Sequence, residues 1–244
     1  MKRELNPKML YFGTPVILVS SLNADGTTNI APMSSVWWVG QTAMLGLSAQ
    51  SQTVRNLEQR PACVLNLVDG GMVDAIDRIA LLTGRPDVPG YKQARGYTYE
   101  PDKFAAAGLS AEHRGDGLPA AVAESPVQLA GEVRAIHEID GPDSGLRALE
   151  VAVLRTHVDD GLLMTGHPNY IDPLRWDPLL MKFTEYFSGA ELSRPSSLAR
   201  GWDMPELATE GPATASTAKA GPATGGTDKA GTAKAGAAAA AIPA

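Results

Sequence analysis

The chain has 244 residues, of which 44% are hydrophobic, and a formal net charge of -6, a composition ordinary for one large globular domain. Its lysines and arginines are scattered singly, so a nucleic-acid surface is not expected. No apolar run approaches the roughly 20 residues needed to span a bilayer. The start of the chain lacks a signal-peptide pattern, and Cys63 is the single cysteine. We therefore expect a soluble, cytoplasmic protein.

The N-terminal part of the chain predicts short β-strands, because runs rich in β-branched residues alternate with turn residues. Asp25 and Gly26 form the clearest turn, since this pair readily adopts the backbone values of a tight hairpin. A short helix is expected from about Ser51 to Gln59, and Pro61 disfavours its continuation. The expected strands are 16–22, 27–31, 43–48 and 63–68.

In the middle of the chain, Met72, Ile76 and Ile79 have helical spacing, and Gly84 is expected to end that helix. Residues 85–101 contain three prolines and predict an extended excursion. Strands separated by turns, with few helices between them, favour a closed or partly closed antiparallel sheet. The later expected strands are 127–133, 149–157 and 162–164.

The composition changes abruptly past Trp202. Gly211-Pro-Ala-Thr recurs at Gly221, and the segment has almost no large apolar side chains. Such a segment cannot offset the entropy lost on ordering. We expect one domain at 1–202 and a disordered tail at 203–244 without a catalytic role.

Hydroxyl side chains gather at the start of the helix expected near Ser51. Ser48, Ser51 and Thr53 place donors where the unpaired N–H groups and the helix dipole both favour an anion, and Asn56 follows one turn later. A phosphate could bind there. In the alternative, Ser51 or Thr53 is simply the residue that caps the helix.

A second cluster, Pro32-Met-Ser-Ser35, combines short side chains with two successive serine N–H groups. These groups could approach a planar ring and stabilise negative charge that develops on it, as an oxyanion hole does. A bulged strand end without a ligand is the alternative. Trp37 and Trp38 are expected as core or interface anchors, because an indole buries much apolar area.

An ordered set of segments resembles the flavin reductase-like proteins, the FMN-binding split-barrel family that includes flavoredoxin-like and monooxygenase-partner reductases. The similarity spans about Leu10 to Arg200 and excludes the tail. The segments that carry it are 19–35, 48–56, 63–67, 101–104 and 124–129.

This resemblance implies a mainly β protein: a six-stranded antiparallel split β-barrel of Greek-key type with capping helices. It also implies a homodimer with FMN near the subunit interface, hydride transfer from NADH or NADPH to FMN, and delivery of reduced flavin to a partner monooxygenase or another acceptor. Carried over by position, the residues expected at the isoalloxazine are Pro32, Met33, Ser34 and Ser35. Those expected around the phosphate are Ser48, Ala49, Gln50, Ser51 and Thr53, with Asn56 bracing that loop.

The chain departs from the family at two points. Many members have a basic residue where this chain has Gln50, and Arg55 is the nearest alternative. Many also have a Gly-Asp-His sequence where this chain reads Pro142-Asp-Ser-Gly-Leu146. His157 and His167 are the candidate catalytic residues in its place, since histidine acts near neutral pH, although a structural role stays open for both. No metal site is predicted.

Three functions therefore stay open. The first is a flavin reductase. The second is a flavoprotein that keeps its FMN and acts on its own small organic substrate, which the missing Gly-Asp-His favours. The third is a non-catalytic flavin-binding electron carrier.

Overall fold

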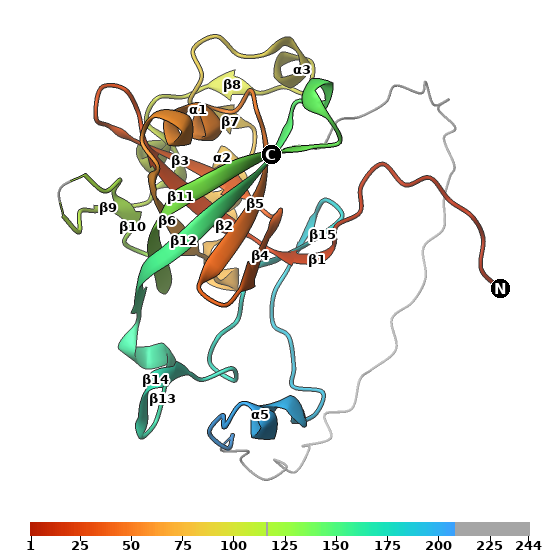
Figure 1. Ribbon diagram of the computed structural model, residues 1–244, viewed down its shortest axis with the longest axis vertical. Helices are drawn as coiled ribbons and strands as arrows, with labels where there is room; N and C mark the ends of the chain where they lie inside the picture. Colours follow the sequence, from red (N-terminus) through yellow and green to blue (C-terminus); the bar gives the residue numbers. More distant parts are fainter. Residues whose placement is uncertain (116, 208–244) are drawn as a thin grey trace, which may run out of the picture. The chain divides into compact units, whose positions relative to one another are not determined.

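A computed structural model of the protein describes residues 1–115 and 117–207 (Figure 1). The described residues form two units, 1–193 and 194–207, and the second contains the short helix α5 (Leu198–Gly201). Most of the tail expected at 203–244 lies outside the described residues. No helix among those described is long and apolar enough to cross a membrane.

The first unit is built on a seven-stranded antiparallel sheet with the order β3-β2-β6-β11-β12-β5-β4. All the expected strands except the last belong to it, and β11 and β12 form one long hairpin. Its strands are β2 (Ile17–Leu22), β3 (Thr28–Met33), β4 (Val36–Val39), β5 (Thr42–Ser48), β6 (Ala62–Leu67), β11 (Val127–Ile139) and β12 (Leu146–Val158).

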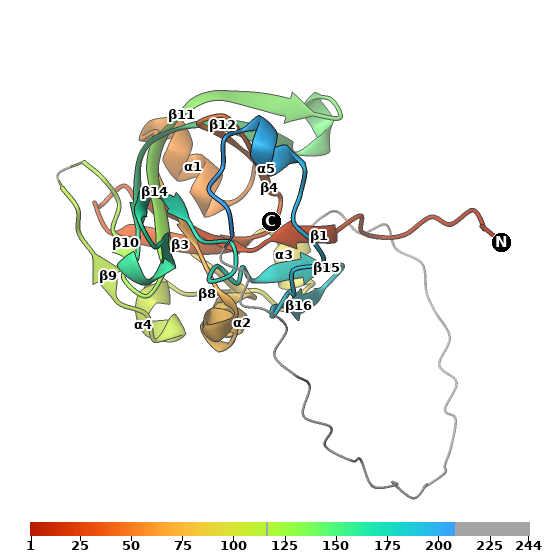
Figure 2. The same ribbon diagram turned by 90° about the horizontal axis from the view of Figure 1, so that it is seen from below.

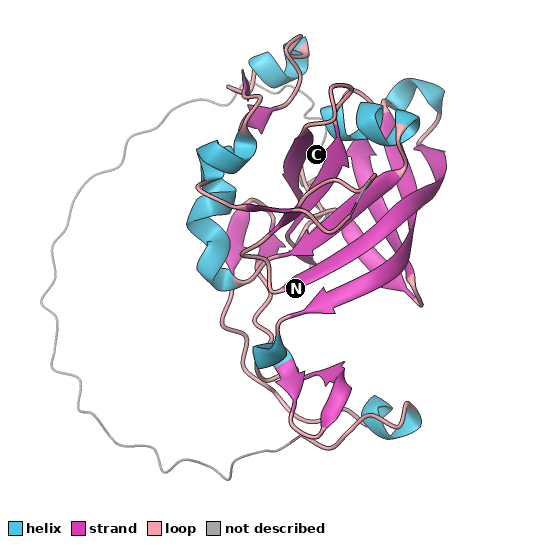
Figure 3. Cartoon of the chain, turned by 90° about the vertical axis from the view of Figure 1, so that its left-hand side faces the viewer, coloured by secondary structure: helices cyan, strands magenta, loops and turns pink. Residues whose placement is uncertain are grey.

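The two edge strands of this sheet are neighbours in the chain. β3 and β4 are separated only by Ser34 and Ser35, yet β3 pairs with β2 and β4 pairs with β5 at the other edge. The sheet therefore curls into a barrel that is interrupted at the two serines (Figure 3). This confirms the expected antiparallel split barrel, with six strands when β3 and β4 are counted as one interrupted strand.

Alternating side chains of the strands fill two separate cores. Ile17 and Leu65 point into the barrel, where Leu57 of α1 (Gln52–Gln59) packs with them. Leu18 points the other way and packs against Ile76 of α2 (Val73–Ile79), beside α4 (Lys103–Ala107). β2 is buried on both faces as a result, and Figure 2 shows α1 on one side of the sheet and α2 with α4 on the other.

Small elements surround the barrel. β1 (Phe12–Pro15), β15 (Leu180–Lys182) and β16 (Glu185–Phe187) form a three-stranded sheet. The short pairs are β7 (Leu82–Thr83) with β8 (Thr98–Tyr99), β9 (Ala111–Glu112) with β10 (Ala121–Val122), and β13 (Leu163–Met164) with β14 (His167–Ile171). The 3₁₀ turns are η1 (Gly70–Met72), η2 (Pro142–Ser144) and η3 (Asp160–Leu162).

Two local expectations were wrong. The helix α2 ends at Ile79, and Gly84 lies beyond it, past the intervening strand β7. Gly84 is needed for space instead, because a Cβ there would overlap the side chain of Asn29. The excursion 85–101 is not simply extended, since it contains the one-turn helix α3 (Gly90–Gln93), whose Lys92 is buried.

Candidate functional site

A cleft opens beside the start of α1 and brings the two serine-rich segments together. Pro32 of β3 lines it, as do Ser51 and Thr53 at the beginning of the helix. The later part of the chain contributes Gly84, Lys92 and Lys103 to the same lining. We call this region, defined by these six residues, the lysine cleft.

The start of α1 is capped and also faces the lysine cleft. The Ser51 hydroxyl accepts a hydrogen bond from the Val54 amide at 3.1 Å, so Ser51 is the N-cap residue. The Thr53 hydroxyl accepts from the Asn29 side chain at 3.4 Å. Capping and ligand binding are compatible for Ser51, because the first turn of a helix has several unpaired N–H groups and the cap uses only one.

Two lysines of the cleft are buried without a carboxylate partner. Lys92 is 6% exposed and Lys103 is 4% exposed, and no ion pair within the described ranges involves either of them. The Lys103 ammonium donates to the Ile30 carbonyl at 2.8 Å. The Lys92 ammonium lies 5.0 Å from the centroid of the Tyr97 ring, a cation–π distance.

Burial perturbs the titration of both lysines. Burial, together with the nearby charge of Lys92 and against a smaller opposing effect of Glu100, lowers the pKa of Lys103 to about 7. Burial likewise lowers the pKa of Lys92 to about 8, with a smaller contribution from the Arg85 charge. An anion in the cleft would stabilise the charged form of both lysines. The lysine cleft therefore has the chemistry expected of a site for an anion.

Lys92 and Lys103 are the basic residues that line the cleft near the segment at Gln50. Arg55 does not line it, and its guanidinium is half-exposed and lies 3.6 Å from Asp87. Arg85 instead fixes the loop before α1, because it donates to the Gln50 carbonyl at 2.8 Å and pairs with Asp87. Sequence reasoning missed both lysines. Lys103 falls inside the resembling segment 101–104, which was the one signal that could have found it.

A second, mostly apolar pocket of about 320 Å³ adjoins the lysine cleft, and the two share Pro32, Ala80 and Tyr97 in their linings. Met33 and Ser34 line it from the end of β3. We call it the apolar pocket. Its further apolar and aromatic lining is Met9, Tyr11, Val16, Ile76, Leu81, Met181, Phe183 and Tyr186.

The interruption between β3 and β4 leaves a backbone donor, the Ser34 amide, at the apolar pocket. Neither the Ser34 nor the Ser35 amide donates to a backbone acceptor within the part of the chain that is described. The Ser35 hydroxyl is bonded to the Tyr11 hydroxyl at 2.7 Å, and Ser35 lines neither cavity. Of the four residues expected at a flavin ring, Pro32, Met33 and Ser34 thus reach the pocket.

The other residues expected at the phosphate have internal partners. The Ser48 hydroxyl is bonded to the Tyr91 hydroxyl at 2.9 Å, and the Ala49 amide donates to the Gly145 carbonyl at 2.8 Å. Asn56 donates to Ser21 and Asn23 at 3.0 and 2.9 Å, so it ties α1 to the β2–β3 hairpin and lies outside the cleft lining.

The two histidines named as candidate catalytic residues line neither cavity. His157 pairs with Gln128 across the β11–β12 hairpin and borders a different hollow with Arg114. His167 is exposed at the start of β14, far from α1 and α3 in Figure 1. The structure therefore brings neither side chain to the lysine cleft or the apolar pocket, because His157 is fixed by the register of β12 and His167 lies in β14.

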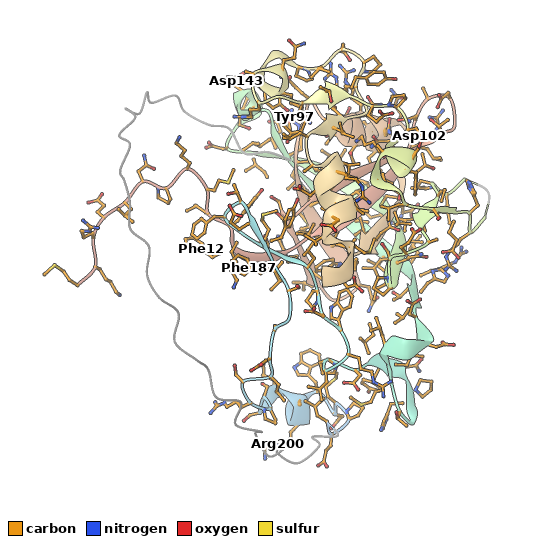
Figure 4. All side chains as sticks on the ribbon, turned by 180° about the vertical axis from the view of Figure 1, so that it is seen from behind. Phe12, Tyr97, Asp102, Asp143, Phe187 and Arg200 are labelled. Atoms are coloured by element: carbon orange, nitrogen blue, oxygen red, sulfur yellow. The ribbon has the colours of Figure 1, made fainter. Side chains whose placement is uncertain are left out.

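The turn that replaces Gly-Asp-His does lie beside the site. The Gly145 carbonyl accepts the hydrogen bond from Ala49, two residues before Ser51 of the lysine cleft, and Figure 4 shows Asp143 of this turn at the same end of the barrel as Tyr97. The position of the missing histidine is thus near the cleft, but no histidine occupies it.

Comparison with known proteins identifies the class to which this fold and site belong. Residues 9–189 match the model of the flavin reductase like domain, so the chain belongs to that family. The uncharacterized protein YdfE of Bacillus subtilis (strain 168) is 34% identical over 193 residues, which cover 79% of this chain and 92% of YdfE. Membership supports a flavoprotein oxidoreductase as the class of function.

Solved structures share the fold at low identity. Flavoredoxin of Desulfovibrio vulgaris (Miyazaki F) is 20% identical with a TM-score of 0.65, covering 82% of this chain and all 100% of its own. Nitrilotriacetate monooxygenase component B from Bacillus cereus is 18% identical with a TM-score of 0.62, covering 80% of this chain and 99% of its own. These likenesses establish the split-barrel architecture.

Proposed function

We propose that the protein is an FMN-dependent oxidoreductase of the flavin reductase type, which takes hydride from NADH or NADPH. The reduced flavin serves a partner monooxygenase or another acceptor. One observation carries the choice of flavin: two buried lysines without carboxylate partners converge on the first turn of α1. A terminal phosphate carries up to two negative charges, and the lysine cleft offers two cations for them.

The residues present fit a phosphorylated flavin. Lys92, Lys103 and the N–H groups at the start of α1 would hold the phosphate, and Thr53 would add a hydroxyl. Pro32, Met33 and Ser34 would border the isoalloxazine, with the Ser34 amide as a donor toward its edge. Bound flavin supplies a ring that accepts and donates hydride, while the protein positions it and excludes water.

A second function has its own support. The apolar pocket is large enough to admit a small organic molecule in addition to contacting the ring, and no histidine lies at the Gly-Asp-His position. These features favour a flavoprotein that retains FMN and acts on its own substrate. A non-catalytic electron carrier stays the third possibility, because the lysine cleft would serve it equally.

We also propose a homodimer in the cytoplasm. The edge strand β4 exposes Trp37 and Val39. The strand β1, which contacts β4, exposes Phe12, labelled in Figure 4. Large apolar side chains gathered at a sheet edge are typical of a protein interface.

Cys63 is fully buried and burial raises its pKa to about 12, so it is inert as a thiol.

The test begins with the full chain freed of flavin. FMN, FAD and riboflavin are titrated separately, and binding is followed by flavin fluorescence. We expect FMN to bind at least tenfold more tightly than riboflavin, because riboflavin lacks the phosphate. Equal affinity for the two would contradict the assignment of the lysine cleft.

Turnover is then measured with FMN and either NADH or NADPH, from the loss of nicotinamide absorbance. A rate above that of a protein-free blank supports the reductase. Retention of FMN through gel filtration without turnover of free flavin would favour the second function instead. Electron transfer from photoreduced protein, with no response to either nucleotide, would identify a carrier.

A further inference from the structure

We propose that the apolar pocket binds an aromatic carboxylate, a flat apolar molecule with one anionic group, and that Arg95 binds this carboxylate. This names a substrate class for the proposed flavoprotein. Its chemistry rests on the proposed function, whereas the binding itself does not.

Arg95 is a cation that the fold leaves unsatisfied inside this pocket. It follows α3 and lines the pocket together with Tyr97. Its Nη1 is buried and has no hydrogen-bond partner among the described residues, and none of the ion pairs found there involves it. A buried N–H group without an acceptor is unfavourable, so an acceptor on a ligand would satisfy it.

The guanidinium is also held in place from one side. Its central carbon lies 5.5 Å from the centroid of the Tyr91 ring, and the Tyr91 hydroxyl is bonded to Ser48. Stacking on an aromatic ring orients the planar group and leaves its N–H edge available. Arginine in such a position suits a carboxylate, which accepts two parallel hydrogen bonds.

The other residues that line the apolar pocket determine which kind of group can accompany the carboxylate of the ligand. Met33 at the end of β3, Met181 of β15 and Phe183 in the turn after β15 present polarisable or aromatic surfaces. Such surfaces favour a flat ring. Asp77 is the acidic residue of the lining and is exposed on α2. Its charge disfavours a second anionic group, which is why we infer a monoanion.

The flavin phosphate does not require Arg95. Lys92 and Lys103 line the lysine cleft, whereas Arg95 lines only the apolar pocket. The structure thus provides separate cations for two separate anions. One is the phosphate, and the other belongs to a molecule that occupies the pocket beside Pro32, Met33 and Ser34.

The experiment compares benzoate with benzamide, which have the same shape but differ in charge. Both are titrated by calorimetry into the full chain with and without bound FMN, and perturbation of the flavin absorption is followed in parallel. We expect wild-type protein to bind benzoate at least tenfold more tightly than benzamide. This comparison does not depend on any variant folding, and equal affinity or no binding of benzoate would overturn the proposal.

The variants locate the charge. Arg95→Gln should weaken benzoate binding by roughly 10- to 100-fold, the usual effect of losing a charge-assisted hydrogen bond, and leave benzamide unchanged. Arg95→Lys should recover part of the loss. Arg55→Gln is the matched control, because it removes an arginine that lines neither cavity, and it should have no effect. An unchanged benzoate affinity in Arg95→Gln would overturn the assignment.

Two outcomes separate this proposal from the proposed function. If FMN does not bind at all, the flavin assignment fails, while the flavin-free titration still decides whether the carboxylate site exists. If benzoate competes with FMN and Arg95→Gln weakens both equally, the pocket belongs wholly to the flavin, and the carboxylate site is refuted.

Discussion

The two cavities of the site are built on opposite physical principles. The lysine cleft concentrates charge: Lys92 and Lys103 are buried, unpaired by carboxylates and shifted to low pKa values. The apolar pocket next to it is lined by methionines and aromatic rings and contains one unsatisfied arginine nitrogen. If the proposed function is right, the affinity for the ligand comes mainly from the lysine cleft, which would bind its anionic group, and the orientation of the ligand comes from the apolar pocket, which would contact its flat ring.

The largest expected effect comes from removing both charges of the lysine cleft. Lys92→Met with Lys103→Met should weaken FMN binding by about 3 to 6 kcal/mol, since each charge-assisted hydrogen bond contributes about 1.5–3 kcal/mol. Fluorescence titration measures the loss. Riboflavin is the internal control, because it lacks the phosphate and should bind the variant and the wild type alike. A parallel loss of riboflavin binding would mean that the cleft has collapsed.

The same lysines predict how FMN binding depends on pH. With pKa values of about 7 and about 8 before the ligand binds, both lysines lose their protons as the pH rises from 7 to 9. Binding of the phosphate then requires proton uptake, so FMN affinity should fall by up to roughly tenfold per pH unit for each proton taken up. Lys92→Arg should flatten part of this dependence, because arginine stays charged.

Stability of the flavin-free protein should show the opposite trend. The folded protein holds the pKa of Lys103 and Lys92 below the value of 10.5, so the unfolded chain binds more protons above about pH 7. The free energy of unfolding should therefore rise with pH from about 7 to about 10.5. Lys103→Met should reduce this slope in urea titrations at several pH values. An unchanged slope would show that Lys103 titrates normally.

A smaller effect on stability and FMN binding is expected from substitution of Gly84, which lines the lysine cleft at a position without room for a side chain. Gly84→Ala would push against Asn29, which donates to Thr53, and should destabilise the fold by about 1–3 kcal/mol. FMN binding should weaken with it, because Thr53 would move. Gly161→Ala is the matched control, since a Cβ there meets no atom within 4 Å and its backbone is not strained. Thermal unfolding and FMN titration of both variants decide the matter.

Sequence reasoning succeeded where the pattern is local. The strands 16–22, 43–48 and 63–68 follow from β-branched runs, and Ser51 and Pro61 mark the two ends of α1. A bulged strand end at Pro32–Ser35 was one of the two interpretations of that segment, but the strand β4 that follows it was not expected. The family resemblance implied a split barrel without indicating where the barrel is interrupted.

What stayed hidden depends on tertiary contacts. Lys92 and Lys103 look like ordinary surface lysines in sequence, because burial is a property of the fold and carries no mark in the residue type. The four-residue helix α3 is too short to show a hydrophobic period. Gly84 was assigned to a helix end because its real constraint, the Asn29 side chain, is distant in the chain. His157 and His167 were named as candidate catalytic residues because histidine can transfer protons near neutral pH, and the sequence did not show where the fold places them.

The smallest effect on binding is predicted for Asn56, which was expected to brace the phosphate loop. Its hydrogen bonds to Ser21 and Asn23 join α1 to the β2–β3 hairpin, and it lines neither cavity. Asn56→Ala should therefore reduce stability by about 1–3 kcal/mol, because buried partners lose their hydrogen bonds. FMN affinity, measured well below the melting temperature, should change by less than about twofold, well under the 1.4 kcal/mol of a tenfold change. A larger loss of FMN affinity would mean that phosphate binding depends on the position of the whole helix α1, and not only on its capped first turn.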